Sequence, residues 1–143
     1  MFSLPIGVHL LLMKDNKVLL SKRLNTGYAD GMWSLPGGKI DGNETLIDAL
    51  CREAFEEIGV MPKNATFKGM MHKIEHNNYE NIATFFVVRD WSGAIDNKEP
   101  HKCSELQFFS IDELPTTISP YISYFFNNMY LKGNMYSEYL TQK

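Results

Sequence analysis

Residues 38–60 of the chain read GKIDGNETLIDALCREAFEEIGV. Between Glu44 and Ile58 the apolar residues recur at three- and four-residue spacing, which is the period of an α-helix with one buried face. Gly59 follows directly, at a position where helices often end on a residue with left-handed backbone. The stretch therefore predicts a polar loop, a helix over residues 44–58 and a stop at Gly59.

The predicted helix carries three carboxylates on one strip of its surface. Glu53, Glu56 and Glu57 are spaced i, i+3, i+4, so they fall within an arc of about 100° beside the apolar stripe. Like charges at this spacing repel one another and destabilise a helix. Oxygen donors this close together suit a hard divalent cation, and we expect Mg²⁺, with Mn²⁺ as a substitute. For three glutamates considered alone, a solvated acidic face is the alternative.

The segments around this helix predict a sheet. Residues 7–13 and 18–23 are apolar runs separated by a polar turn, which indicates a hairpin. Residues 33–36 predict a short extended piece, and residues 65–73, 82–90 and 105–110 predict further strands. An aromatic-rich helix is expected over residues 119–132. Helices that flank mixed strands indicate an α/β sandwich, and without an internal repeat or linker we expect one domain over residues 1–143.

The fixed residues of the opening stretch resemble a family signature. Gly38 is followed by five residues and Glu44, and seven more residues lead to REAFEEIGV at 52–60. This resembles the box of the Nudix hydrolases, which is Gly, five residues, Glu, seven residues, Arg-Glu-U-x-Glu-Glu-x-Gly-U, where U is a bulky aliphatic residue. Ala54 at the first U position is the one departure. The resemblance implies a Nudix-type α/β/α sandwich with a mixed β-sheet between helices.

The resemblance also implies roles for the matched residues. The three box carboxylates would hold Mg²⁺, and one of them would accept a proton from the attacking water. The backbone carbonyl of Gly37 would add a metal ligand. Arg52 and Glu44 would pair and brace the loop against the helix. The expected catalytic set is therefore Glu53, Glu56, Glu57, Arg52 and Glu44, and the expected metal set is Gly37, Glu53, Glu56, Glu57 and Glu99.

Glu99 joins that set through a second resemblance. The segment EPHKC at 99–103 looks like part of some MutT-like nucleoside triphosphate pyrophosphatases, in which the loop lies near the active site. A solvated loop glutamate is the alternative. Arg23 and Lys39 are the expected phosphate ligands, against the alternative of surface cations. In the final helix Phe125 or Phe126 is expected to stack on a base, although most of its aromatic residues should be core.

Composition restricts the class of protein. With 44% hydrophobic and 22% charged residues the chain has ordinary globular composition, and its net charge of -3 argues against a duplex-binding protein. Two cysteines are too few for a disulfide framework, and the N-terminus resembles no signal peptide, so we expect a cytoplasmic protein. The longest N-terminal apolar run is too short to span a bilayer. A monomer or homodimer is expected.

These observations predict an enzyme. The first expectation is Mg²⁺-dependent cleavage of a nucleoside diphosphate linkage, most simply of a (deoxy)nucleoside triphosphate to the monophosphate and pyrophosphate. ADP-ribose, nucleotide sugars and dinucleoside polyphosphates are alternative substrates. The alternative of another class is a non-catalytic nucleotide sensor, but a sensor need not keep the carboxylates.

Overall fold

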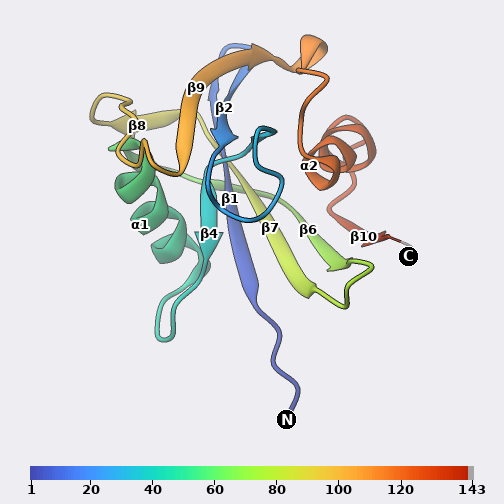
Figure 1. Cartoon of the computed structure of the whole chain (residues 1–143). Coiled ribbons are helices and arrows are strands. Elements are labelled where there is room, and N and C mark those ends of the chain that lie inside the picture. Colours follow the sequence, from blue (N-terminus) through green and yellow to red (C-terminus); the bar gives the residue numbers. More distant parts are fainter. Residues whose placement is uncertain (142–143) are drawn as a thin grey trace.

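The computed structural model describes residues 1–141 as a mixed α/β structure (Figure 1). In chain order its elements are β1 (Ile6–Lys14), β2 (Lys17–Arg23), β3 (Trp33–Ser34), β4 (Gly37–Lys39), α1 (Leu46–Ile58), β5 (Met61–Lys63), β6 (Thr66–Ile74), β7 (Glu80–Val88), β8 (Asp90–Ser92), β9 (Cys103–Ser110), the short 3₁₀ helix η1 (Ile111–Glu113), α2 (Pro120–Phe125), the π-helix η2 (Phe126–Tyr130) and β10 (Tyr136–Leu140).

Eight strands form one mixed sheet in the order β10-β6-β7-β1-β2-β3, with β4 paired to β1 and β9 paired to β2. The β1–β7 and β10–β6 pairs are parallel and the other pairs are antiparallel. Helix α1 lies on one side of the sheet and α2 on the other (Figure 1). The predicted sandwich with a mixed sheet is therefore confirmed. No helix within residues 1–141 is long and apolar enough to cross a membrane.

Strand β1 explains why both faces of the sheet are covered. Val8, Leu10 and Leu12 belong to a core cluster with the apolar face of α1, whereas Leu11 and Met13 belong to a second cluster with α2 and η2. Side chains alternate between the faces of a strand, so an uninterrupted apolar run can fill both cores at once. The two cores hold α1 and α2 against opposite faces of the sheet.

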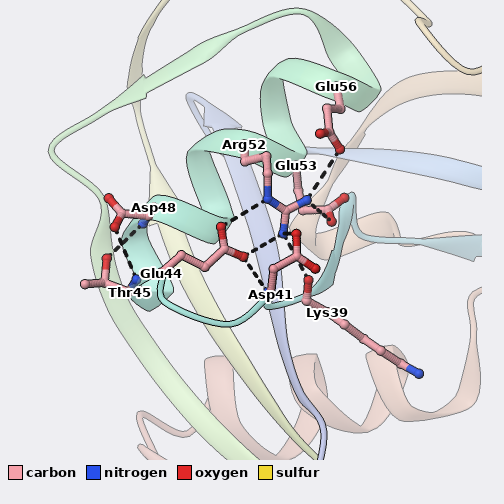
Figure 2. A network of polar contacts seen from close by, with 8 residues as sticks. All are labelled: Lys39, Asp41, Glu44, Thr45, Asp48, Arg52, Glu53 and Glu56. Carbon is pink, nitrogen blue, oxygen red and sulfur yellow. Dashed lines mark hydrogen bonds and ion pairs between the residues drawn. The ribbon is translucent and has the colours of Figure 1, made fainter.

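Helix α1 begins and ends at clear signals. Thr45 is its N-cap and exchanges hydrogen bonds with Asp48 in a capping box (Figure 2). Gly59 ends the helix with φ 74°. Its buried face consists of Ala49, Leu50, Ala54 and Ile58. The observed helix starts two residues after the predicted one. The N-cap at Thr45 leaves Glu44 outside the helix, where the Glu44 carboxylate accepts hydrogen bonds from Arg52.

The C-terminal segment differs from the prediction, which placed one helix over residues 119–132. Helix α2 ends at Phe125, a π-helix continues to Tyr130, and the unpredicted strand β10 follows. Phe125 is 0% exposed and stacks on Phe85 with ring centroids 3.9 Å apart, and Phe126 is 1% exposed. The expectation that one of them stacks on a base is wrong, because both rings belong to the core cluster between α2 and the sheet and neither lines a cavity.

Phe126→Ala is accordingly expected to act on stability. Removing a fully buried phenylalanine should lower the free energy of unfolding by about 3–5 kcal/mol. Chemical denaturation measures this, with Phe55→Ala as the matched control, since Phe55 is 60% exposed on α1. Equal losses in the two variants would contradict the core assignment of Phe126.

Candidate active site

The backbone of Gly37 and Gly38 joins the sheet to the carboxylate face of α1. Strand β4 pairs with β1 through these glycines. A Cβ atom at Gly37 would overlap the carbonyl oxygen of Val8, and one at Gly38 would lie 2.5 Å from Oε1 of Glu53. Glycine is required at position 37, where the clash is with backbone, whereas a side chain at position 38 would displace the carboxylate of Glu53. The two glycines therefore bring the sheet edge directly against Glu53.

Arg52 connects the loop before α1 to the carboxylates on α1 (Figure 2). Its Nη2 and Nε donate to the two carboxylate oxygens of Glu44, at 2.8 and 3.1 Å, and Nη2 also donates to the carbonyl of Lys39. Its Nη1 donates to Glu53 at 2.9 Å and lies 3.5 Å from Glu56. The structure thus contains the expected Glu44–Arg52 pair, in bidentate form. The same guanidinium also contacts two of the three box carboxylates.

Charge pairing explains the protonation states of this network. The hydrogen bonds from Arg52 lower the pKa of Glu44, and the backbone N–H of Asp41 lowers it further. The hydrogen bond to Glu44 raises the pKa of Arg52, and Glu53 adds to that effect. Both members are therefore charged at neutral pH, which holds the 39–44 loop against the helix.

Glu57 has the opposite environment. Burial is the first cause that raises its pKa well above the ordinary value, followed by its hydrogen bond with Glu53 and the charges of Glu53 and Glu99. The backbone N–H of Gly37 donates to Glu57 at 3.2 Å and lowers the pKa only partly. The negative charge on Glu57 is thus poorly compensated within the protein.

The three box carboxylates and Glu99 line one cleft of about 470 Å³. It is lined by Glu53, Glu56, Glu57 and Glu99, by the cations Arg23 and Lys102, and by the backbone of the two glycines. The Glu99 loop is fixed because Asn97 bonds both the N–H of Glu99 and the carbonyl of Cys103. The structure therefore places Glu99 beside the box carboxylates, as the sequence led us to expect.

As the side chains lie, no three His, Cys, Asp or Glu residues within the described chain converge closely enough to hold a metal ion. Glu53 and Glu56 are instead directed toward Arg52. The residues nevertheless fit a divalent cation: Glu57 is partly buried among carboxylates that raise its pKa, and a hard cation would remove this repulsion. The oxygen-only donor set suits Mg²⁺ better than a softer metal.

A second cavity of about 370 Å³ adjoins the acidic cleft and shares Arg23, Leu35, Gly37 and Gly38 with it. It lies on the α2 side of the sheet, where Tyr121 from α2 meets His9 from β1, with the Tyr121 hydroxyl 2.8 Å from Nε2. Burial lowers the pKa of His9 to about 3, so this histidine is a neutral part of the wall. The aromatic wall comes from Tyr28, Tyr79 and Tyr121.

The two predicted phosphate ligands occupy different places. Arg23 lies between the two cavities, where its guanidinium donates to the carbonyl of Tyr28 at 2.6 Å and to the hydroxyl of Thr26 at 3.0 Å. Lys39 lines the second cavity, with its Nζ 6.0 Å from the ring centroid of Tyr79, and does not line the acidic cleft. The cleft is lined instead by Lys102, which belongs to the segment at 99–103.

Three other residues that line the second cavity could not be identified from the sequence. Lys73 and Asn81 stand on β6 and β7, and Tyr28 stands on the loop after β2. No motif or period connects them in the sequence. Only the pairing of Lys73 with Asn81 across the β6–β7 hairpin brings the two side chains together.

Comparison with known proteins gives consistent matches. The family model described as NUDIX domain matches residues 3–129. The chain is 31% identical over 110 residues to an ADP-ribose pyrophosphatase of Methanocaldococcus jannaschii, covering 77% of this chain and 64% of the archaeal protein, so it spans less than two thirds of that relative. It is 28% identical over 127 residues to an 8-oxo-dGTP diphosphatase of Escherichia coli, covering 86% of this chain and 96% of that protein. A MutT NUDIX hydrolase from Burkholderia pseudomallei has a similar structure, with TM-score 0.82, 28% identity and coverage of 88% of this chain and 98% of that one.

Proposed function

Since this chain belongs to the NUDIX domain family of hydrolases, we propose that it is a Mg²⁺-dependent pyrophosphohydrolase that converts a nucleoside triphosphate to the monophosphate and pyrophosphate. One observation carries the proposal. The acidic cleft and the tyrosine-lined cavity meet at Gly37 and Gly38, so one elongated ligand can occupy both. A triphosphate matches the acidic cleft once metal is bound, and a planar base matches the aromatic cavity.

Each side chain of the cleft has a proposed task. Glu53, Glu56 and Glu57, with the carbonyl of Gly37 and with Glu99, hold the metal directly or through water. Bound Mg²⁺ supplies charge neutralisation for the phosphoryl oxygens and makes the attacking water more acidic. A box glutamate accepts the proton of that water.

The cations complete the phosphate site. Arg23 stands between the two cavities and can hold a phosphate oxygen while its other N–H groups remain bonded to the loop at Thr26 and Tyr28. Lys102 lines the cleft on the side of Glu99 and is the second phosphate ligand that we propose. Arg52 keeps Glu44 and the loop in place and does not contact substrate. Both cysteines are free, which agrees with the proposed cytoplasmic location.

The substrate class follows from the walls of the second cavity. Three tyrosines offer stacking surface for a planar base, and the cations Arg23, Lys39 and Lys73 lie beside them, whereas ADP-ribose would also need a site for its terminal ribose. We therefore expect nucleoside triphosphates to exceed ADP-ribose in kcat/KM by at least about tenfold, a difference of about 1.4 kcal/mol that one stacking contact can supply.

A substrate panel with Mg²⁺ and identified products checks this expectation. The archaeal relative makes ADP-ribose the most informative competitor, and UDP-glucose serves as a nucleotide sugar without the adenine base. If ADP-ribose is the best substrate of the panel, the triphosphate proposal is wrong although the hydrolase family assignment holds.

A further inference from the structure

The second cavity has an uneven charge distribution. Its lining includes the cations Arg23, Lys39 and Lys73, and within residues 1–141 no carboxylate lines it. Glu75 contacts two of the lining residues, with its Oε2 3.6 Å from Nζ of Lys73 and its Oε1 accepting a hydrogen bond from the Tyr28 hydroxyl. A ligand in this cavity therefore meets mainly hydrogen-bond donors.

Lys73 is an unusual member of this wall because its side chain is only 3% exposed. Its Nζ lies 3.3 Å from the ring centroid of Tyr121 and 5.6 Å from that of Tyr28. Burial lowers the pKa of Lys73 to about 8, and Glu75 limits the decrease, so the ammonium is charged at neutral pH. An ammonium has three N–H donors and accepts nothing, and at 3.6 Å the ion pair with Glu75 is longer than a hydrogen bond.

Asn81 supplies the complementary group. It is the register partner of Lys73 across the antiparallel β6–β7 pair, so the two side chains are on the same face with Cβ atoms roughly 5 Å apart. Its Nδ2 lies 3.4 Å from the Tyr79 hydroxyl, whereas its buried Oδ1 accepts no hydrogen bond from any residue that the structure describes. A buried acceptor without a partner is costly unless a ligand satisfies it.

We propose that Lys73 and Asn81 recognise the lactam edge of a nucleobase, so that the enzyme prefers bases with a ring carbonyl beside an N–H over bases with an amino group there. Lys73 donates to the carbonyl oxygen and Asn81 Oδ1 accepts from the neighbouring ring N–H. Hypoxanthine, guanine and uracil have this edge, whereas adenine and cytosine do not. The inference rests on the proposed function and specifies the substrate class of the same site.

The arrangement disfavours adenine for two reasons. In the position that a lactam takes, the amino group of adenine would direct N–H bonds at the ammonium of Lys73, and its unprotonated N1 would face the acceptor Oδ1 of Asn81. If adenine shifts by one position, its amino group can donate to Oδ1 of Asn81. The ammonium of Lys73 then faces a ring nitrogen, which is a weaker acceptor than a carbonyl oxygen. Sites built around specific hydrogen bonds discriminate strongly for this reason.

The matched substrates are dITP and dATP, which differ only at this edge. We expect wild-type protein with Mg²⁺ to prefer dITP in kcat/KM by at least about tenfold. Lys73→Met should bring the ratio close to one, and Lys63→Met, at an exposed lysine on strand β5, should leave the ratio unchanged. A wild-type preference for dATP, equal use of both, or a folded Lys73→Met protein that keeps the dITP preference would overturn the proposal.

Binding experiments separate this inference from the proposed function and need no folded Lys73 variant. Calorimetry of wild-type protein with dIMP and dAMP measures the same discrimination without turnover. Tighter binding of dIMP, lost in Asn81→Ala, supports the lactam site even if neither triphosphate is hydrolysed, in which case the proposed function alone fails. Equal binding of the two monophosphates contradicts the lactam site even if both triphosphates are hydrolysed.

Discussion

Glu57→Gln is expected to lower kcat by about 10³-fold or more while raising the melting temperature of the metal-free protein. The loss of activity follows because the variant removes one charged oxygen ligand and a candidate proton acceptor. The helix should persist, because glutamine is a good helix former and its carbonyl can still accept from the N–H of Gly37.

The stabilisation follows from the sign of the pKa change. Burial and the neighbouring carboxylates raise the pKa of Glu57 in the folded protein, so the folded state binds more protons than the unfolded state between the two pKa values. The stability contributed by Glu57 therefore falls as the pH rises through that interval. At neutral pH the uncharged glutamine avoids part of the cost of burying a negative charge beside other carboxylates.

Melting curves with and without Mg²⁺ test both halves of this expectation. Mg²⁺ should raise the melting temperature of the wild type and have a smaller effect on Glu57→Gln. Glu113→Gln, at an exposed glutamate of η1, is the control and should change neither activity nor the response to Mg²⁺. Near-normal turnover in a folded Glu57→Gln protein would exclude Glu57 from the metal site.

Arg52→Ala is expected to lower both stability and activity. Its guanidinium lies within 3.5 Å of carboxylate oxygens of Asp41, Glu44, Glu53 and Glu56, and its removal leaves these charges without their cation. The side chain of Arg52 is 27% exposed, so we expect a loss of about 1–3 kcal/mol rather than the larger penalty of a fully buried pair. Activity should fall at least about tenfold, because the 39–44 loop, which follows Gly37 and Gly38 of β4, loses its brace.

Two comparisons identify the origin of this effect. Arg52→Lys keeps the charge but not the bidentate bond to Glu44, so it should be intermediate in melting temperature. Arg89→Ala removes an exposed arginine outside the site and should leave activity unchanged. An Arg52→Ala protein with an unchanged melting temperature but no activity would instead indicate that Arg52 contacts substrate.

The helix of the box could be predicted from sequence because its signals are local. The apolar period from Leu46 to Ile58 and the stop at Gly59 require no knowledge of distant residues. The start was placed two residues early, because Glu44 continues the helical pattern in the sequence but is held outside the helix by Arg52 and by the N–H of Asp41. The acidic cleft was predicted for the same reason, since three of its carboxylates stand on one helix.

The second cavity could not be predicted, because its residues come together only through the tertiary fold. Tyr28, Lys73, Asn81 and Tyr121 come from a loop, two strands and a helix. The aromatic residues of the C-terminal helix gave a misleading signal. Phe125 is enclosed by Phe85 of the sheet and by Phe126 and Tyr130 of the following π-helix, and a sequence pattern does not distinguish such a core from a binding wall.

Product analysis of a nucleoside triphosphate tests the central claim most directly. Wild-type protein is incubated with dITP or dGTP in Mg²⁺, in Mn²⁺ and in EDTA, and phosphorus NMR identifies the products. We predict equal amounts of nucleoside monophosphate and pyrophosphate with either metal and no turnover in EDTA. Release of nucleoside diphosphate and orthophosphate, or the same rate in EDTA as in Mg²⁺, would contradict a metal-dependent pyrophosphohydrolase.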